Sequence, residues 1–313
     1  MRNLSNGSKA VIQLNNLTKK FGKFHAVSNI SLEVMRGEIY GFVGLNGAGK
    51  STTIHMMLSL LKPTSGSVHL LGKKVDFGSY ELWERVGFLE EASYYPGLTV
   101  EENLDIARRM QKLPDRQCIA DIIQRLGLTA HKNKKAENLS LGNRQRLGLA
   151  KAMIHNPEIL ILDEPINGLD PAGVVEVRDS LINLSKNYGV TIFLSSHLLE
   201  ELAKLADRIG IIHEGRLVQD IDADHLERSL RKHLVLDGRD KTAMKRILLE
   251  QGYRIQENVD GCLILSDDYV TENPEKLNEL LVHSGQTPTQ LNIIAEDLEG
   301  YFLRTIQSTK GVY

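Results

Sequence analysis

The sequence predicts an α/β fold with a mostly parallel central sheet, followed by a small α+β domain. Three observations support this expectation. Short, unbroken apolar runs at 159–162 and 190–194 are typical of strands buried on both faces of a parallel sheet. Another apolar run, at 39–43, leads through a glycine-rich loop into a helix. After residue 232 the pattern changes to short strands and helices that carry no catalytic constellation.

Length and composition restrict the number of domains and the kinds of partner that the chain can have. A chain of 313 residues is long enough for two domains. The formal net charge of −2 gives no overall attraction to nucleic acid or anionic lipid. Cys118 and Cys262 lie far apart without a CxxC partner, which is typical of ordinary thiols in a reducing cytosol. No apolar run approaches the roughly 20 residues that span a bilayer, so we expect any membrane role to depend on a partner chain.

The loop after the strand at 39–43 has the pattern of a phosphate-binding loop. Gly44-x-x-x-x-Gly49-Lys50-Ser51 allows successive backbone N–H groups to point at a phosphate, and the following helix start adds its own N–H groups and positive dipole end. Lys50 would serve the β- and γ-phosphates, and the Ser51 hydroxyl could bind Mg²⁺. The sequence therefore predicts a nucleoside triphosphate site. The residues expected to contact the nucleotide here are Gly44, Asn46, Gly47, Ala48, Gly49, Lys50, Ser51 and Thr52.

Residues 99–156 have the apolar spacing of helices. Within them, Ser140 is placed to cap a helix that runs to about Ile154, and Gly142 leaves room for a group to approach the first turn. Such a helix start is either a second phosphate-facing site or simply a capped helix. Taken alone, this stretch favours the simple capped helix.

Two carboxylates follow the buried strand at 159–162. Asp163 and Glu164 stand at its carboxyl end, where ligands bind in open α/β sheets. Asp163 would reach Mg²⁺, and Glu164 is the candidate general base for an attacking water. His197 ends the next apolar strand at the same edge. A lone histidine there is more often structural. This one follows a strand that ends at the same edge as Asp163 and Glu164, so we expect it to belong to the site.

The chain is expected to divide into four parts. Residues 1–9 are polar and predicted to form a flexible tail. Residues 10–218 contain all the motifs above and form the nucleotide-binding domain. The charged, helix-prone stretch 219–232 is interpreted as a connector, and 233–313 as an accessory α+β domain.

Together these motifs resemble the nucleotide-binding subunits of ABC transporters over roughly residues 10–218. The match rests on several motifs in the right order and not on one loop. Gly44–Thr52 matches the Walker A motif, Ile159–Glu164 the Walker B motif, Leu139–Asn143 the LSGGQ signature, Gly168–Asp170 the D-loop, His197 the switch histidine and Phe21 the aromatic residue that stacks on the base.

The resemblance implies a P-loop NTPase core of the RecA-like type, with a helical subdomain inserted at about 92–156. It also implies hydrolysis of ATP with Mg²⁺ between two copies of the chain, each site combining one copy's Walker A with the other's signature. Ser140 and Gly142 would then contact the γ-phosphate of the nucleotide bound by the partner, and Asp170 of the D-loop is also expected to contact nucleotide. The expected partners are a second copy, in a homodimer, and separate transmembrane permease subunits, with no nucleic acid. The expected location is cytoplasmic, on the inner face of the cell membrane.

The sequence departs from the family pattern at the signature and at the Q-loop. Leu141 and Asn143 stand in place of Gly and Gln, whereas Ser140 is kept. At the Q-loop a carboxylate replaces the usual Gln. Spacing from the preceding strand favours Glu91 and spacing from the following Tyr-Pro favours Glu90, which we choose as a ligand of Mg²⁺.

A Glu at the Q-loop, with Ser-Leu-Gly and Gln-Arg-Leu-Gly in the signature helix, resembles the bacitracin and lantibiotic self-immunity exporters. That resemblance points to efflux of peptide antibiotics or related amphiphiles. Two alternatives stay open. One is an ABC ATPase that acts on ribosomes or DNA, although such proteins usually carry two ATPase domains or a long coiled-coil insertion. The other is a transporter of another substrate class.

Overall fold

The computed structural model describes residues 9–76, 78–258 and 261–308. The chain forms two compact units that divide between Asp224 and His225, and each is described by itself. Residues 1–8 of the tail expected over 1–9 lie outside the described ranges. Within the described ranges, no helix is both long and apolar enough to cross a membrane.

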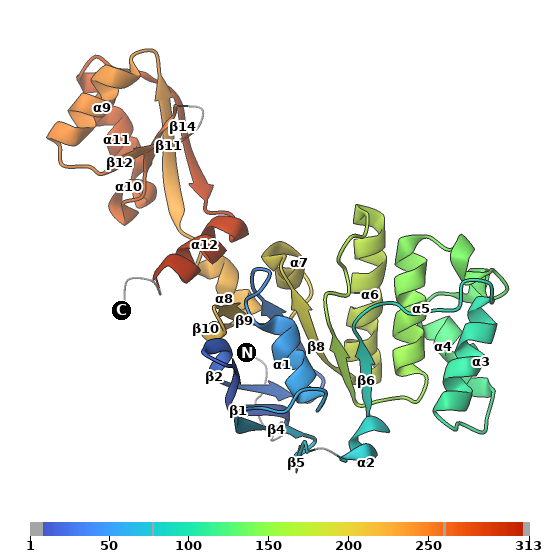
Figure 1. Cartoon of the computed structure of the whole chain (residues 1–313). Helices are drawn as coiled ribbons and strands as arrows, with labels where there is room; N and C mark the ends of the chain where they lie inside the picture. Colours follow the sequence, from blue (N-terminus) through green and yellow to red (C-terminus); the bar gives the residue numbers. More distant parts are fainter. Residues whose placement is uncertain (1–8, 77, 259–260, 309–313) are drawn as a thin grey trace. The chain divides into compact units, whose positions relative to one another are not determined.

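The first unit is built on a six-stranded sheet in the order β10-β9-β3-β8-β7-β6 (Figure 1). The five strands from β6 to β9 are parallel to their neighbours, and only β10 is antiparallel. Every residue of β3, β7 and β8 is buried, as expected of strands covered on both faces. The predicted α/β fold is confirmed. The strands are β3 (Ile39–Val43), β6 (Val86–Leu89), β7 (Ile159–Leu162), β8 (Thr191–Ser196), β9 (Arg208–His213) and β10 (Arg216–Asp222).

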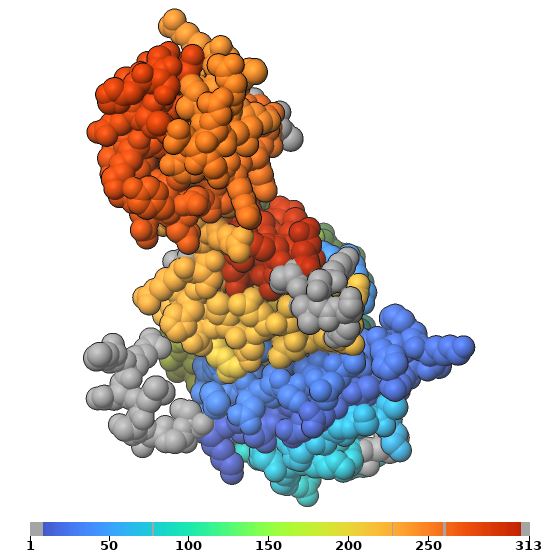
Figure 2. All heavy atoms as spheres, turned by 90° about the vertical axis from the view of Figure 1, so that its left-hand side faces the viewer, coloured from blue at the N-terminus to red at the C-terminus, as the bar shows by residue number. Residues whose placement is uncertain are grey.

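A second, antiparallel sheet has the order β2-β1-β4-β5. Its inward apolar side chains share one core with helix α1 and the central sheet. The backbone N–H of Ser28 donates to the carbonyl of Gly215, 2.7 Å away, which ties β2 to the β9–β10 turn. Figure 2 shows the blue atoms of β1 and β2 beside the gold atoms of β10, in line with the contact between β2 and β10. The strands are β1 (Ala10–Phe21), β2 (Phe24–Met35), β4 (Ser65–Leu70) and β5 (Lys73–Lys74).

Between β6 and β7 the chain inserts a group of helices, which contact one another and α6 (green in Figure 1). Thr99 and Glu102 form a reciprocal capping box at the start of α3, which satisfies two N–H groups at that helix end. The inserted helices are α3 (Val100–Met110), α4 (Gln117–Arg125) and α5 (Leu141–Met153). The others of this unit are α1 (Lys50–Met57), α2 (Tyr80–Trp83), α6 (Pro171–Tyr188) and α7 (Leu199–Ala203).

The stretch 219–232, which the sequence suggests is a connector, contains the end of β10, a helix and the first residue of β11. Asp222 pairs with Arg208, so residues 219–222 belong to β10. Residues 223–228 form helix α8 (Ala223–Arg228), and the division between the two units falls inside this helix. Charge alone gave no sign of the pairing, because edge strands also carry charged side chains.

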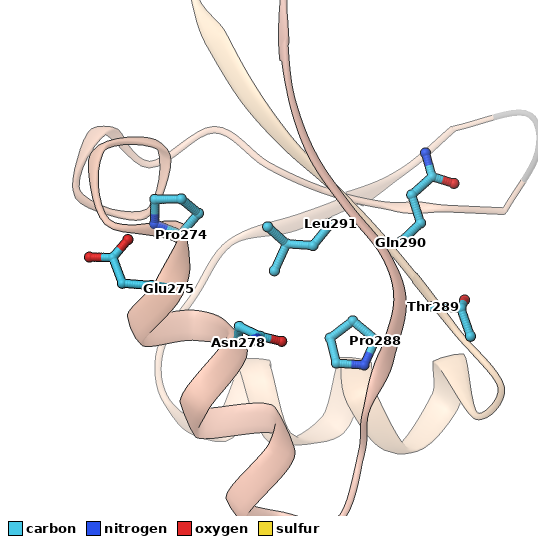
Figure 3. Close-up of a pocket in the computed structure, with 7 residues that line it drawn as sticks. All are labelled: Pro274, Glu275, Asn278, Pro288, Thr289, Gln290 and Leu291. Atoms are coloured by element: carbon cyan, nitrogen blue, oxygen red, sulfur yellow. The ribbon is translucent and has the colours of Figure 1, made fainter.

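The second unit is an antiparallel sheet in the order β12-β13-β11-β14 with its own apolar core. A hollow of about 260 Å³ lies between α11 and β14, where Asn278 and Leu291 line the space and do not fill it (Figure 3). The elements are β11 (Lys232–Gly238), α9 (Lys241–Glu250), β12 (Ile255–Glu257), β13 (Leu263–Leu265), α10 (Asp268–Glu272), α11 (Pro274–His283), β14 (Pro288–Ala295) and α12 (Leu298–Ser308).

Candidate nucleotide site

The loop between β3 and α1 has a backbone that side chains would disturb. Gly47 and Gly49 have φ of 81° and 108°, in the left-handed region that favours glycine. A Cβ on Gly49 would stand 2.5 Å from the carbonyl oxygen of Ala26, and one on Gly44 would stand 2.5 Å from the carbonyl oxygen of Ile212. The glycines of the motif are therefore required both by conformation and by close packing of the loop.

Helix α1 begins without a side-chain cap. Its N-cap residue is Gly49, no side chain accepts a hydrogen bond from its first turn, and that turn has no acidic residue. By contrast, the starts of α5 and α6 are capped by Ser140 and Asp170. An uncapped helix start offers unpaired N–H groups and a positive dipole end to an anion. Of these three helix starts, α1 is the one whose backbone N–H groups are left without a side-chain cap and can bind phosphate.

A hollow of about 390 Å³ opens over this helix start, within the range of small-molecule sites. It joins the phosphate-binding loop to the β1–β2 hairpin and to the end of β7. Two aromatic side chains stand at its hairpin side, Phe21 and Phe24, which pair across the turn and are 52% and 64% exposed. The lining residues are Phe21, Phe24, Ala26, Asn46, Gly47, Gly49, Lys50, Ser51, Thr52 and Glu164.

Lys50 is a nearly buried cation at the centre of this group, with 6% of its surface exposed. Its Nζ donates to the carbonyl oxygens of Gly44, at 2.7 Å, and Leu45, at 3.3 Å. The same nitrogen lies 3.2 Å from Oε1 of Glu164. The carbonyls and the carboxylate compensate a buried charge that would otherwise be costly. A phosphate entering the loop would compete for this ammonium group.

The carboxyl ends of β7 and β8 form a second hydrogen-bonded group, because these strands are parallel neighbours. The hydroxyl of Ser195 donates to Oδ1 of Asp163 at 2.5 Å and accepts from the backbone N–H of Glu164 at 2.9 Å. Nδ1 of His197 lies 3.0 Å from Oε2 of Glu164. Glu164 itself has φ of 50°, a left-handed conformation that is uncommon outside glycine. Its carboxylate is therefore held between Lys50 on one side and His197 on the other.

Ser195, two residues before His197, is a site residue that the sequence did not single out. It is fully buried, and it orders both carboxylate-bearing residues at the end of β7. The available signal was a pair of serines directly after the apolar residues 192–194.

The helix start at Ser140 is capped as predicted, and the Asn that replaces Gln in the signature takes part. Ser140 Oγ accepts from the backbone N–H of Asn143 at 3.2 Å and from its Nδ2 at 2.8 Å. Arg146 donates to Oδ1 of Asn143 at 2.6 Å and to Glu176 on α6 at 2.9 Å. Two bonds accepted by the Ser140 oxygen leave its own O–H free to donate elsewhere. A Cβ on Gly142 would stand 3.1 Å from Cα of Gly173, so this glycine also lets α5 and α6 approach closely.

The predicted residues fall into four sets in one copy of the chain. Phe21, Asn46, Gly47, Gly49, Lys50, Ser51, Thr52 and Glu164 meet at the hollow, and Asp163 and His197 join them through Ser195 and Glu164. Gly44 and Ala48 belong to the loop framework, and the Ala48 N–H is engaged with the carbonyl of Leu45 at 3.0 Å. Ser140, Gly142 and Asp170 are not among the residues lining the hollow. Glu90 follows β6, and its Oε1 lies 3.1 Å from Nε2 of His55 on α1.

Comparison with known proteins agrees with this geometry. The family described as ABC transporter matches residues 27–167. The bacitracin transport ATP-binding protein BcrA of Bacillus licheniformis is 38% identical over 95% of this chain and 97% of its own length. The lantibiotic transport ATP-binding protein SrtF of Streptococcus pyogenes is 35% identical over 69% of this chain and 93% of its own.

A solved structure of similar fold is a dimeric, post-hydrolysis state of the ATP-binding cassette MJ0796 bound to ADP and Pi. It has a TM-score of 0.60 and 25% identity, covering 68% of this chain and 98% of that one. The motifs, the sheet topology and a relative that aligns along nearly the whole length all point to one family. The chain belongs to the ABC transporter family, and within it to the ATP-binding subunits, which hydrolyse ATP.

Proposed function

We propose that this protein energises a membrane exporter of peptide antibiotics or related amphiphiles, through ATP hydrolysis in a homodimer. The observation that carries the ATPase part is the arrangement of Lys50, Glu164 and His197 at the edge of the central sheet. The bacitracin and lantibiotic transport proteins among its relatives support the export part, as does the Glu at the Q-loop.

In this proposal the hollow over α1 holds ATP. Phe21 stacks on the adenine ring, since an exposed aromatic face beside the phosphate loop suits a planar base. Phe24, its neighbour across the turn, offers a second apolar surface. The first-turn N–H groups of α1 and the Lys50 ammonium group bind the β- and γ-phosphates.

Two oxygen donors, the Ser51 hydroxyl in the hollow and the Asp163 carboxylate beside Glu164, are of the kind that Mg²⁺ prefers. Asp163 is 5% exposed, and its Oδ1 accepts from Ser195, so Oδ2 is the atom available to a metal or to a bound water. Among the described residues, no three potential ligands gather tightly enough to hold a metal by themselves. Mg²⁺ commonly binds through one or two protein oxygens, and nucleotide phosphates and water complete its coordination. Ser51 and Asp163 can supply the protein oxygens. When bound, the ion would neutralise phosphate charge.

Glu164 is the proposed general base. Its carboxylate is restrained by His197 at Oε2 and by Lys50 at Oε1. Once Lys50 turns to the phosphates, Oε1 becomes available to accept a proton from the attacking water. His197 keeps the carboxylate oriented meanwhile.

The proposal assigns Ser140, Gly142 and Asp170 to the nucleotide of a second copy. Ser140 keeps an O–H that can donate to a γ-phosphate, and residues at the starts of α5 and α6 do not line the hollow of their own chain. Asp170 is already engaged as a cap, where its Oδ1 accepts from the N–H of Gly173 at 2.9 Å. A site completed by the same surface of an identical chain is consistent with two-fold symmetry.

Mixing two inactive variants tests this arrangement. Lys50→Ala disables one chain's phosphate loop, and Ser140→Arg blocks the other chain's signature. In an equal mixture half the dimers are mixed and each has one intact site, so about a quarter of the wild-type ATPase rate should return. A mixture that stays as inactive as its components would contradict shared sites.

An apolar hollow of about 270 Å³ is the proposed docking surface for a permease segment on the cytoplasmic face of the membrane. It lies among the end of α1, α2 and β6, and its lining includes Leu60, Tyr80, Trp83 and Phe88. Leu60 and Tyr80 are 65% and 76% exposed. Large exposed apolar side chains gathered around a hollow are typical of protein contacts.

Co-purification from detergent-solubilised membranes tests both the partner and the surface. We expect a polytopic membrane protein to be recovered with the tagged chain, and Tyr80→Ser to lose most of it while its basal ATPase rate stays unchanged. Tyr269→Ser is the matched control, since Tyr269 is also an exposed tyrosine but belongs to the second unit. Recovery of ribosomal or DNA-associated proteins in place of a membrane protein would overturn the transporter proposal.

A further inference from the structure

His55 connects two segments that approach the proposed Mg²⁺ site. It lies on α1 four residues after Ser51, so the two side chains share one face of the helix, one turn apart. Its Nε2 lies 3.1 Å from Oε1 of Glu90, which directly follows β6. The pair therefore joins the helix after the phosphate loop to the segment that contains the Q-loop carboxylate.

The backbone brings the same segment next to Asp163. The carbonyl of Leu89, the last residue of β6, accepts the N–H of Asp163 at 2.8 Å. Glu90 and Asp163 thus leave neighbouring parallel strands at the same edge of the sheet. Glu90 has a side chain that is 52% exposed, so packing does not fix its carboxylate. The hydrogen bond to His55 holds the Glu90 carboxylate in one orientation.

We infer that His55 is a positioning residue, which holds the Glu90 carboxylate near the Ser51 face of α1, where it can serve the metal ion that accompanies ATP. This inference rests on the proposed function and deepens it, because it also selects Glu90 and not Glu91 for that role. A carboxylate at position 90 adds a negative charge at the same edge of the central sheet as Asp163. The hydrogen bond from His55 to one oxygen of Glu90 fixes the orientation of the carboxylate, and so fixes the side from which its other oxygen can reach the metal ion.

Binding of Mn²⁺, measured by electron paramagnetic resonance with a non-hydrolysable ATP analogue, tests the inference without relying on turnover. We expect His55→Leu to weaken Mn²⁺ binding by about 10-fold, the lower end of the range for residues that orient metal ligands. His55→Gln should restore most of the affinity, because its amide nitrogen reaches about as far as Nε2. His55→Asn should not, because its amide is too short to replace Nε2.

A double-mutant cycle separates positioning from a general structural effect. In a Glu90→Ala background, His55→Leu should weaken Mn²⁺ binding no further, whereas in a Glu91→Ala background it should keep its full effect. Equal losses in both backgrounds, or unchanged binding in His55→Leu alone, would overturn the inference. Failure of the wild-type chain to bind the ATP analogue at all would instead overturn the proposed function, and this inference with it.

Discussion

Replacing Glu164 with Gln should reduce ATP turnover by roughly 10²–10⁴-fold while ATP binding is kept, as expected for loss of a general base. The amide has the shape of the carboxylate and can still accept from Lys50, but it cannot take a proton from water. The measurement is kcat at saturating Mg²⁺ and ATP, together with the Kd for a fluorescent ATP analogue. Normal turnover in this variant would remove Glu164 from the role.

Two controls accompany this variant. Glu164→Asp keeps the charge but shortens the side chain, so it should also be slow if the position of the carboxylate matters. Glu214→Gln changes an exposed carboxylate at the β9–β10 turn and should leave kcat unaltered. If ATP holds two copies together, Glu164→Gln should also accumulate as a dimer with ATP in light scattering. Only monomer under that condition would count against the homodimer.

Replacing Lys50 with Ala should weaken binding of ATP about 10–100-fold, the loss expected for a hydrogen bond to a charged group. Lys50 lies nearly buried, with its ammonium group directed to the loop carbonyls and to Glu164. In the proposed site it would bind the β- and γ-phosphates and would not reach the adenine ring. The loss should therefore appear for ATP and be small for adenosine, as measured by equilibrium binding of both ligands.

Lys204→Ala is the matched control, because this lysine is half-exposed and pairs with Glu201, three residues away in the chain, at 3.1 Å. It should bind ATP as the wild-type protein does. Melting temperatures of both variants check that the fold is kept. If ATP affinity were unchanged in folded Lys50→Ala, the phosphate contact would be ruled out.

How far the sequence could predict this protein depended on how local each feature is. The phosphate loop is a local motif: its strand, glycines and helix are consecutive, and residues 39–57 form the predicted β3, loop and α1. The N-cap at Ser140 is equally local and is found as predicted. The strand pairing that extends β10 to Asp222 is not local, and charge patterning suggested a connector there.

The sequence by itself determined the family, the α/β fold and the identity of the phosphate loop, because consecutive residues and the order of motifs carry that information. Only the tertiary structure decided which side chains meet. Ser195 reaches Asp163 because β7 and β8 are parallel neighbours, and Phe24 joins the hollow because it pairs with Phe21. Likewise, the choice between two adjacent glutamates was open in the sequence. The contact between Glu90 and His55, 35 residues apart in the chain, now favours Glu90, since folding alone brings α1 to the end of β6.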